Sequence, residues 1–184
     1  SKNTYDITDY GAIGNGIVDD RQAIQLAINA CRATDGDLII PRPSNFYRIN
    51  GTLEIMPKAP DDQIYIKILG QGQSDRGIVY MGPSGQPAIK LIGLKGGSID
   101  NVNVRIGEGI SNAVCWDIGT DELCSSTAGF TFSNCVAALG TGVNNRGWRL
   151  GFIDGKNVSD ISQILWSNCT AWGNRASGSV GWEN

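Results

Sequence analysis

The chain repeats itself at an interval of 33 to 34 residues, and this interval restricts the folds that it can adopt. Three aligned segments carry an asparagine at the same place, at Asn101, Asn134 and Asn168. Further along, the dipeptide Gly-Trp at 147–148 recurs at 181–182. A fixed interval with matching residue types is typical of stacked coils, in which each coil buries the face of its neighbour. A β-sandwich gives no reason for such an interval.

Short apolar runs separated by turn residues fill most of the chain. Glycine accounts for 25 of the 184 residues, which indicates many tight turns. Together with the repeat, these runs predict an all-β solenoid of stacked coils. The repeated asparagines can adopt a left-handed conformation at the bends and bond to one another between coils, which is a structural role. The strands are expected at 38–40, 47–49, 53–56, 64–69, 78–81, 88–94, 98–106 and 113–118.

One segment near the N-terminus predicts a helix. Apolar residues recur with helical spacing over residues 20–32, which is one face of an amphipathic helix about three turns long. Residues 5–10 are spaced as in a strand, and a glycine-rich loop joins them to the helix. Asp19 and Asp20 lie where the helix begins, and a carboxylate there can accept free N–H groups of the first turn. We expect a helix that caps the β-helix, with both aspartates in a structural role.

The same segment resembles the opening motif of a known superfamily. Residues 9–28 match the pattern D-Y-G-A-x-G-N-G-x-x-D-D-x-x-A-I-Q-x-A-I, which is similar to the N-terminal motif of the pectate-lyase-like superfamily. That superfamily consists of right-handed parallel β-helices and includes pectin-degrading enzymes, rhamnogalacturonases, alginate epimerases and phage tailspikes. The resemblance implies the fold, an all-β, right-handed, single-stranded parallel β-helix, and a polysaccharide partner. It implies no catalytic residue, because in the family this motif forms the N-terminal cap.

The length suits one domain with a sizeable core. Residues 1–35 are expected to form the first strand, the loop and the capping helix, and residues 36–184 the coils. No polar capping stretch follows the third aligned segment, and an open end would expose strand edges. We therefore expect the chain to be the N-terminal part of a longer protein, or a partner to cover this end.

Charge and composition exclude several classes of function. A net charge of −3 disfavours nucleic acid as a partner, because phosphates call for a basic face. No apolar run approaches 18 residues, and the N-terminal SKNTYD lacks the features of a signal peptide, so neither a membrane partner nor a leader is predicted. Histidine is absent, which removes Ser-His-Asp and Cys-His catalysis. The expected location is extracellular or virion-associated.

The five cysteines include no C-x-x-C pair, which argues against a zinc site and a full disulfide framework. Most are expected to be buried thiols that pack as small apolar residues. A single bridge between Cys115 and Cys124 is the alternative.

The tryptophans all lie in the second half of the chain and are candidates for sugar binding. Trp148 and Trp182 occupy equivalent positions in the repeat, and with Trp172 they could form a track on which sugar rings stack. The alternative is an inward-facing aromatic ladder that fills the core.

Catalysis in a chain without histidine requires carboxylates or cations. Glycoside hydrolysis needs two carboxyl groups roughly 5–9 Å apart. Lyase chemistry on uronic acids needs a base and a group that neutralises the substrate carboxylate. The candidates are the acids Glu108, Asp117, Asp121, Glu122 and Asp154 and the bases Arg146 and Arg149. For each acid, a solvated loop charge is the alternative.

Asp117, Asp121 and Glu122 are the nearest approach to a calcium-binding cluster, although their spacing matches no known calcium loop. No other metal and no cofactor is predicted.

Three functions remain open at this stage. The first is a polysaccharide-binding and polysaccharide-degrading protein, a lyase or hydrolase of acidic or bacterial-surface glycans. The second is a phage tailspike or surface adhesin that recognises a host polysaccharide, which would suggest a homotrimer. The third is a non-catalytic structural β-helix.

Overall fold

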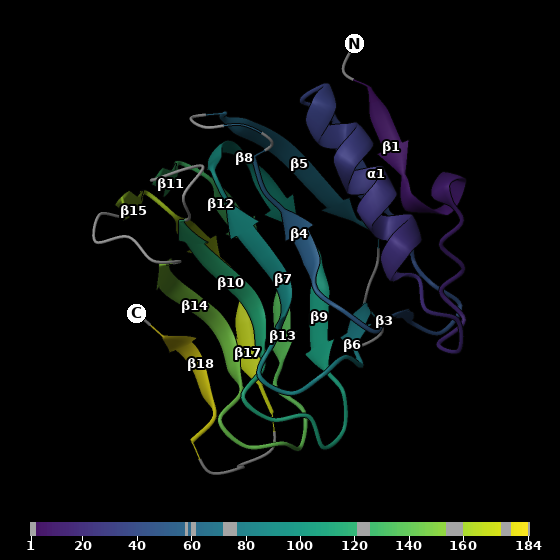
Figure 1. Ribbon diagram of the computed structural model, residues 1–184, viewed down its shortest axis with the longest axis vertical. Helices are drawn as coiled ribbons and strands as arrows, with labels where there is room; N and C mark the ends of the chain where they lie inside the picture. The colour runs from purple at the N-terminus through teal and green to yellow at the C-terminus, as the bar shows by residue number, and fades with distance from the viewer. Residues whose placement is uncertain are drawn as a thin grey trace.

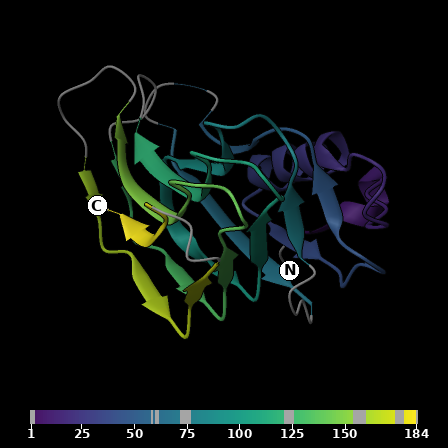
Figure 2. The same ribbon diagram turned by 90° about the horizontal axis from the view of Figure 1, so that it is seen from below.

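The computed structural model is a parallel β-helix in which successive coils stack along one axis (Figure 1). It describes residues 3–57, 59, 62–71, 77–120, 126–153, 160–173 and 178–183. Every strand pair is parallel, and three sheets run along the stack, so the predicted fold class is confirmed. Figure 2 shows the helical cap at one end of the stack and the C-terminal strands at the other.

Each coil contributes one strand to each of the three sheets. The first sheet consists of β1 (Thr4–Asp6), β2 (Asp37–Ile40), β5 (Ile64–Gly70), β8 (Leu94–Asp100), β12 (Thr131–Ser133) and β16 (Leu165–Ser167). The second consists of β3 (Tyr47–Ile49), β6 (Ile78–Tyr80), β9 (Asn103–Ile106), β13 (Val136–Ala138) and β17 (Thr170–Trp172). The third consists of β4 (Leu53–Ile55), β7 (Pro87–Ile92), β10 (Val114–Thr120), β14 (Arg146–Ile153) and β18 (Val180–Glu183). A further pair is formed by β11 (Ser126–Ala128) and β15 (Asp160–Ser162).

The predicted capping helix is α1 (Arg21–Ala33), which lies across the N-terminal end of the stack (Figure 1). Its apolar face is buried against the first coil through Ile24, Ala27, Ile28 and Cys31. No helix in the described part of the chain is long and apolar enough to cross a membrane.

The strand predicted over residues 5–10 is only half right. β1 ends at Asp6, and Ile7–Tyr10 form a 3-10 helix, η1. The Asp6 carboxylate accepts a hydrogen bond from the Thr8 N–H at 2.8 Å, which satisfies a donor of the turn and draws the backbone out of the extended conformation.

The two aspartates before α1 have different structural roles. Asp19 accepts a hydrogen bond from the Arg21 N–H at 3.0 Å, as expected of a carboxylate at a helix start. Asp20 occupies the cap position but makes no side-chain bond to the helix. Its buried carboxylate instead accepts the N–H groups of Ile13 and Gly14, at 2.8 and 3.0 Å. Asp20 therefore fixes the glycine-rich loop, which corrects its predicted capping role.

The register between coils follows the repeat seen in the sequence. Ile99, Phe132 and Trp166 lie side by side on β8, β12 and β16. The sequence alignment of the three segments is therefore also a spatial alignment of their strands.

The three repeated asparagines all take the left-handed conformation, with φ between 53° and 56°. Asn168 donates to the Asn134 side chain at 2.7 Å, as predicted. The ladder stops there, because Asn134 donates to Asp100 at 3.0 Å and Asn101 donates to the carbonyl of Gly70 at 3.3 Å. Asp100, and not Asn101, is therefore the acceptor for the Asn134 side chain.

Four of the cysteines lie among the described residues and all are free thiols. Cys115 is fully buried, with Sγ 3.6 Å from the carbonyl of Val104, so the alternative of a Cys115–Cys124 bridge is wrong. Burial raises the pKa of Cys115, and it raises the pKa of Cys135 to about 12. These thiols pack as apolar residues, as expected.

Candidate functional site

Charged side chains from five neighbouring strands form one row across the third sheet, which we call the charge row. In register, Glu54 lies beside Lys90, Lys90 beside Asp117, Asp117 beside Arg149, and Arg149 beside Glu183. Carboxylate and cation therefore alternate on β4, β7, β10, β14 and β18. Neighbouring strands are about 4.8 Å apart, so the row crosses the strands and runs along the axis of the stack.

The centre of the charge row is an ion pair between Asp117 and Arg149. Both carboxylate oxygens accept from the guanidinium, Oδ1 from Nε at 2.9 Å and Oδ2 from Nη2 at 2.8 Å. The Asp117 side chain is 1% exposed, whereas that of Arg149 is 34% exposed. The hydrogen bond with Asp117 raises the pKa of Arg149, although burial acts in the opposite direction. A bidentate pair of this kind fixes the direction as well as the charge of both groups.

A second ion pair lies beside the first. Nε of Arg146 is 2.9 Å from Oε1 of Glu183, and another guanidinium nitrogen of Arg146 donates to the carbonyl of Gly178 at 2.6 Å. Arg146 begins β14 and Glu183 ends β18. This pair therefore ties the start of one strand to the end of the next.

Two open cavities adjoin the charge row and meet at Arg149. One has a volume of about 270 Å³ and reaches Glu54, Lys90 and Asp117. The other has a volume of about 300 Å³ and reaches Arg146 and Glu183. Further residues complete their walls, and most of them are polar or glycine: Thr52, Gly85, Gln86, Pro87, Asn112, Val114 and Asn144. Both cavities are thus lined mostly by polar and charged groups.

The structure brings three of the predicted candidates together, Asp117, Arg146 and Arg149. The hydrogen bonds of these residues restrict the chemical roles that they can have. Asp117 gives both oxygens to Arg149, and Arg149 is held protonated by that contact, so the predicted role of Arg149 as a base is a poor match to its geometry. Paired and directed charges of this kind suit the binding of polar groups. The candidate Asp154 lies outside the described residues.

The sequence reasoning missed Glu54, Lys90 and Glu183. Glu183 follows Trp182 as Arg149 follows Trp148, so the repeat itself contained a signal for it. Lys90 and Glu54 become neighbours of Asp117 only once the register of β7 and β4 is known.

The predicted sugar track of tryptophans does not form. Trp148 is fully buried in the core and stacks on Trp182 at a ring distance of 4.8 Å. In register, Trp116, Trp148 and Trp182 form a ladder that faces inward, because Trp116 is also fully buried. A sugar cannot reach Trp148, which corrects its predicted role. Trp182 belongs to the same ladder but is 43% exposed.

Trp172 lies on a different sheet from the ladder. It ends β17 and is 42% exposed. Glu108 is also on that side of the molecule, where its carboxylate accepts a hydrogen bond from Thr141 at 2.8 Å. These two candidates are therefore separate from the charge row.

The calcium prediction involves residues that the structure only partly describes. Asp121 and Glu122 lie outside the described residues, and Asp117 is engaged by Arg149. Among the described residues, no group of three potential ligands is close enough to hold a metal ion. Calcium binding stays a prediction.

Comparisons with known proteins place the chain beside polysaccharide-modifying and viral proteins. Mannuronan C5-epimerase AlgE2 of Azotobacter vinelandii is 28% identical over 162 residues, which cover 88% of this chain and 14% of the epimerase. Mannuronan C5-epimerase AlgE6 of the same organism is 36% identical over 72 residues, which cover 38% of this chain and 8% of that protein. The chain thus spans a small part of the curated relatives that it matches.

Among solved structures, ORF18 of Geobacillus virus E2 superposes with a TM-score of 0.53 and 15% sequence identity, over 98% of this chain and 40% of the viral chain. No protein-family model matches the chain. A likeness at this identity concerns the fold alone. The parallel β-helix, its N-terminal helical cap and this superposition together show that the chain has the parallel β-helix fold that its repeat and its N-terminal motif predict.

Proposed function

We propose that this chain is a polysaccharide-binding part of a protein that acts on an acidic polysaccharide, and that the polymer lies along the charge row. The observation that carries the proposal is the alternation of carboxylate and cation across five strands, beside two cavities that meet at Arg149. The similarity to mannuronan epimerases over 88% of the chain supports a uronate polymer as the ligand.

The geometry of the charge row suits a long and hydroxyl-rich ligand. Lys90 and Arg149 can donate to the carboxylates of the polymer, and Glu54 and Glu183 can accept from its hydroxyl groups. Because the residues stand on rigid strands and already hold each other in place, little conformational entropy is lost when a ligand binds. A polymer that follows the stack axis meets a new pair of charges on each coil.

The proposal gives the charge row a binding role. Proton transfer at Asp117 or Arg149 would have to break a buried bidentate pair, in which each group stabilises the charged form of the other. A lyase, hydrolase or epimerase reaction would therefore use other groups, while the row orients the chain of sugars.

The test is a titration of the protein with acidic polysaccharides by calorimetry, mannuronan among them. New reducing ends and the ultraviolet absorbance of unsaturated uronic ends are followed in the same samples. We expect Lys90→Gln to weaken binding about tenfold, because a contact between opposite charges is lost. Lys67→Gln, which removes the same charge from an exposed position on β5 of the first sheet, is the matched control and should not weaken it. Equal affinity of the wild type and Lys90→Gln would contradict the proposal.

The two alternatives from the sequence make different predictions. A tailspike or adhesin that forms a homotrimer would show three times the mass of the chain in solution, measured by light scattering. A purely structural β-helix would bind none of the polysaccharides in the titration. An absence of binding would overturn the proposal above, whereas a trimer that binds would assign the binding to a tailspike or adhesin.

A further inference from the structure

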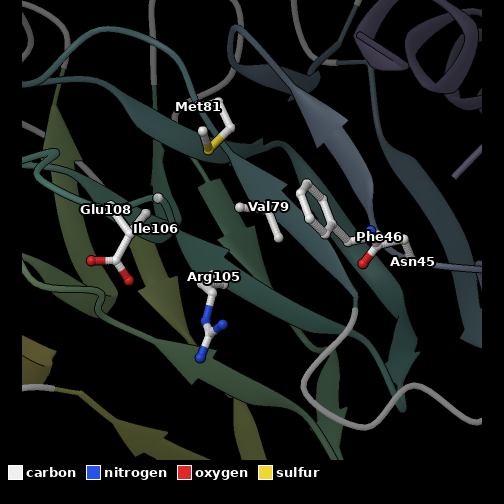
Figure 3. A pocket seen from close by; sticks show the side chains of 8 residues that line it. Asn45, Phe46, Val79, Met81, Arg105, Ile106 and Glu108 are labelled. Atoms are coloured by element: carbon white, nitrogen blue, oxygen red, sulfur yellow. The ribbon is translucent and has the colours of Figure 1, made fainter. Parts of the chain in front are cut away.

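A second concave site lies on the second sheet, away from the charge row. Two cavities of about 320 and 210 Å³ are both lined by Arg105 and Glu108, so they adjoin at these two side chains, and we call the two together the groove. Phe46 lies at one end and Trp172 at the other. Figure 3 shows that Phe46, Val79, Arg105 and Glu108 project into the larger cavity. Phe46, Val79 and Met81 give this cavity an apolar wall.

The register of the second sheet builds the groove. Arg105 on β9, Ala138 on β13 and Trp172 on β17 lie side by side. Because Ala138 is small, the side chains on either side of it can meet above it. The guanidinium carbon of Arg105 lies 5.2 Å from the centre of the Trp172 ring, a cation–π contact that holds the charge at the floor of the groove.

Arg105 is a cation without a carboxylate partner in the part of the chain that the structure describes. Its register neighbours are Val79 and Ala138, and its side chain makes no hydrogen bond or ion pair with a described residue. A guanidinium has five N–H donors in a plane that matches a carboxylate. Glu108, the nearest acid in the groove, is instead fixed by Thr141. The donors of Arg105 are therefore directed to solvent or to a ligand.

We propose that this groove is a second saccharide site, which binds a carboxylate-bearing sugar residue with the carboxylate on Arg105. The apolar face of the sugar ring lies against Phe46 and Val79, and Glu108 accepts a hydroxyl group. Trp172 positions the guanidinium. The larger cavity is at the lower end of the range for small-ligand sites, about 300–1,000 Å³, which suits one or two sugar units. The class of ligand rests on the proposed function, whereas the site rests on the groove itself.

The test uses the full chain with its five tryptophans replaced by 5-fluorotryptophan, so that each site reports separately by fluorine NMR. Trp172→Phe identifies the resonance of Trp172. The probes are a mannuronate tetrasaccharide and the same tetrasaccharide after reduction of its carboxyl groups. We expect the acidic probe to shift the Trp172 resonance, and the reduced probe to shift it at least tenfold more weakly.

Two variants with the same change of charge separate the groove from a general charge effect. Arg105→Gln should abolish the shift of the Trp172 resonance. Arg48→Gln is the matched control, because Arg48 is on β3 of the same sheet, lines neither cavity and bonds to Asn50. It should leave the shift unchanged. An equal loss in both variants would overturn the proposal.

The remaining outcomes distinguish this site from the charge row. Calorimetric binding that depends on Lys90, with a Trp172 resonance that never moves, would overturn the groove and leave the proposed function standing. Equal shifts with both probes would overturn the role of Arg105 in reading a carboxylate. A poly-glutamate peptide that shifts the resonance as strongly as the tetrasaccharide would overturn the sugar as occupant. An absence of both heat and shifts would overturn the proposed function as well.

Discussion

On the third sheet Arg149 has a carboxylate beside it in register, whereas on the second sheet Arg105 has an alanine and a valine beside it. Arg149 therefore closes on Asp117 and contributes to the rigidity of the face. Arg105 instead stacks on Trp172 and keeps its donors available. In a stack of parallel strands, the residue in register on the next coil decides whether a cation is part of the framework or part of a ligand site.

The largest expected effect concerns two tryptophans that the sequence does not separate. Trp148→Ala should lower the free energy of unfolding by about 3–5 kcal/mol, because it removes a fully buried ring from the core. Trp172→Ala should lower it by only about 1 kcal/mol or less, the size of an exposed cation–π contact. Urea denaturation of both variants measures the difference. Similar losses would show that Trp172 is also a core residue.

The next effect separates the two arginines. Arg149→Gln should destabilise the fold by about 3 kcal/mol, because it leaves the Asp117 carboxylate buried without its partner. Arg105→Gln should cost about 1 kcal/mol or less, since its partner is a ring and not a buried charge. The double variant Asp117→Asn with Arg149→Gln is the control and should regain part of the lost stability. An equal loss of unfolding free energy in the two arginine variants would contradict the claim that Arg149 belongs to the framework and Arg105 to a ligand site.

A smaller effect is expected from filling the gap between Arg105 and Trp172. Ala138→Leu places a larger side chain between them, so the cation–π contact is lost and the groove is obstructed. We expect about tenfold weaker binding of the acidic tetrasaccharide, about 1.4 kcal/mol, and a loss of stability of about 1–3 kcal/mol, because Ala138 is buried and the larger side chain overpacks its surroundings. Binding that depends on Lys90 should be unaffected. Undiminished binding in the groove would show that the ligand contacts another surface.

The smallest expected effect is the response to salt. Raising NaCl from ~0.05 M to ~0.5 M should weaken tetrasaccharide binding severalfold, because exposed charges are screened. The difference in unfolding free energy between the wild type and Arg149→Gln should change little, since the buried side of that pair is screened much less. Calorimetry and denaturation at the two salt concentrations measure both. A pair as salt-sensitive as the ligand would contradict the structural role of Asp117.

Much of the fold could be predicted because the repeat fixes register. Asn134 and Asn168 are 34 residues apart in the sequence, and in the structure their side chains are hydrogen-bonded to each other. The helical spacing of the apolar residues predicted the capping helix in the same way, because those residues form its buried face. The 3-10 turn at Ile7–Tyr10 could not be predicted from spacing, because its cause is a single side-chain bond from Asp6.

The sites were harder to predict than the fold. Asp117 and Arg149 are 32 residues apart, so their pairing does not follow from an interval of 33 or 34. Arg105 and Trp172 do follow the repeat, four residues after Asn101 and Asn168. Their contact depends on a small residue at the same place in the coil between them. The small residue between them is recognised only when the register of the strands is known. The burial of Trp148 likewise depends on which side of its strand faces the core.

The central claim, that the chain binds an acidic polysaccharide through its cations, is tested most directly by calorimetric titration of the wild-type protein with mannuronan and with carboxyl-reduced mannuronan. We expect the acidic polymer to bind at least tenfold more tightly than the reduced one, which corresponds to about 1.4 kcal/mol or more. Equal affinities, or no measurable binding of either polymer, would contradict the claim.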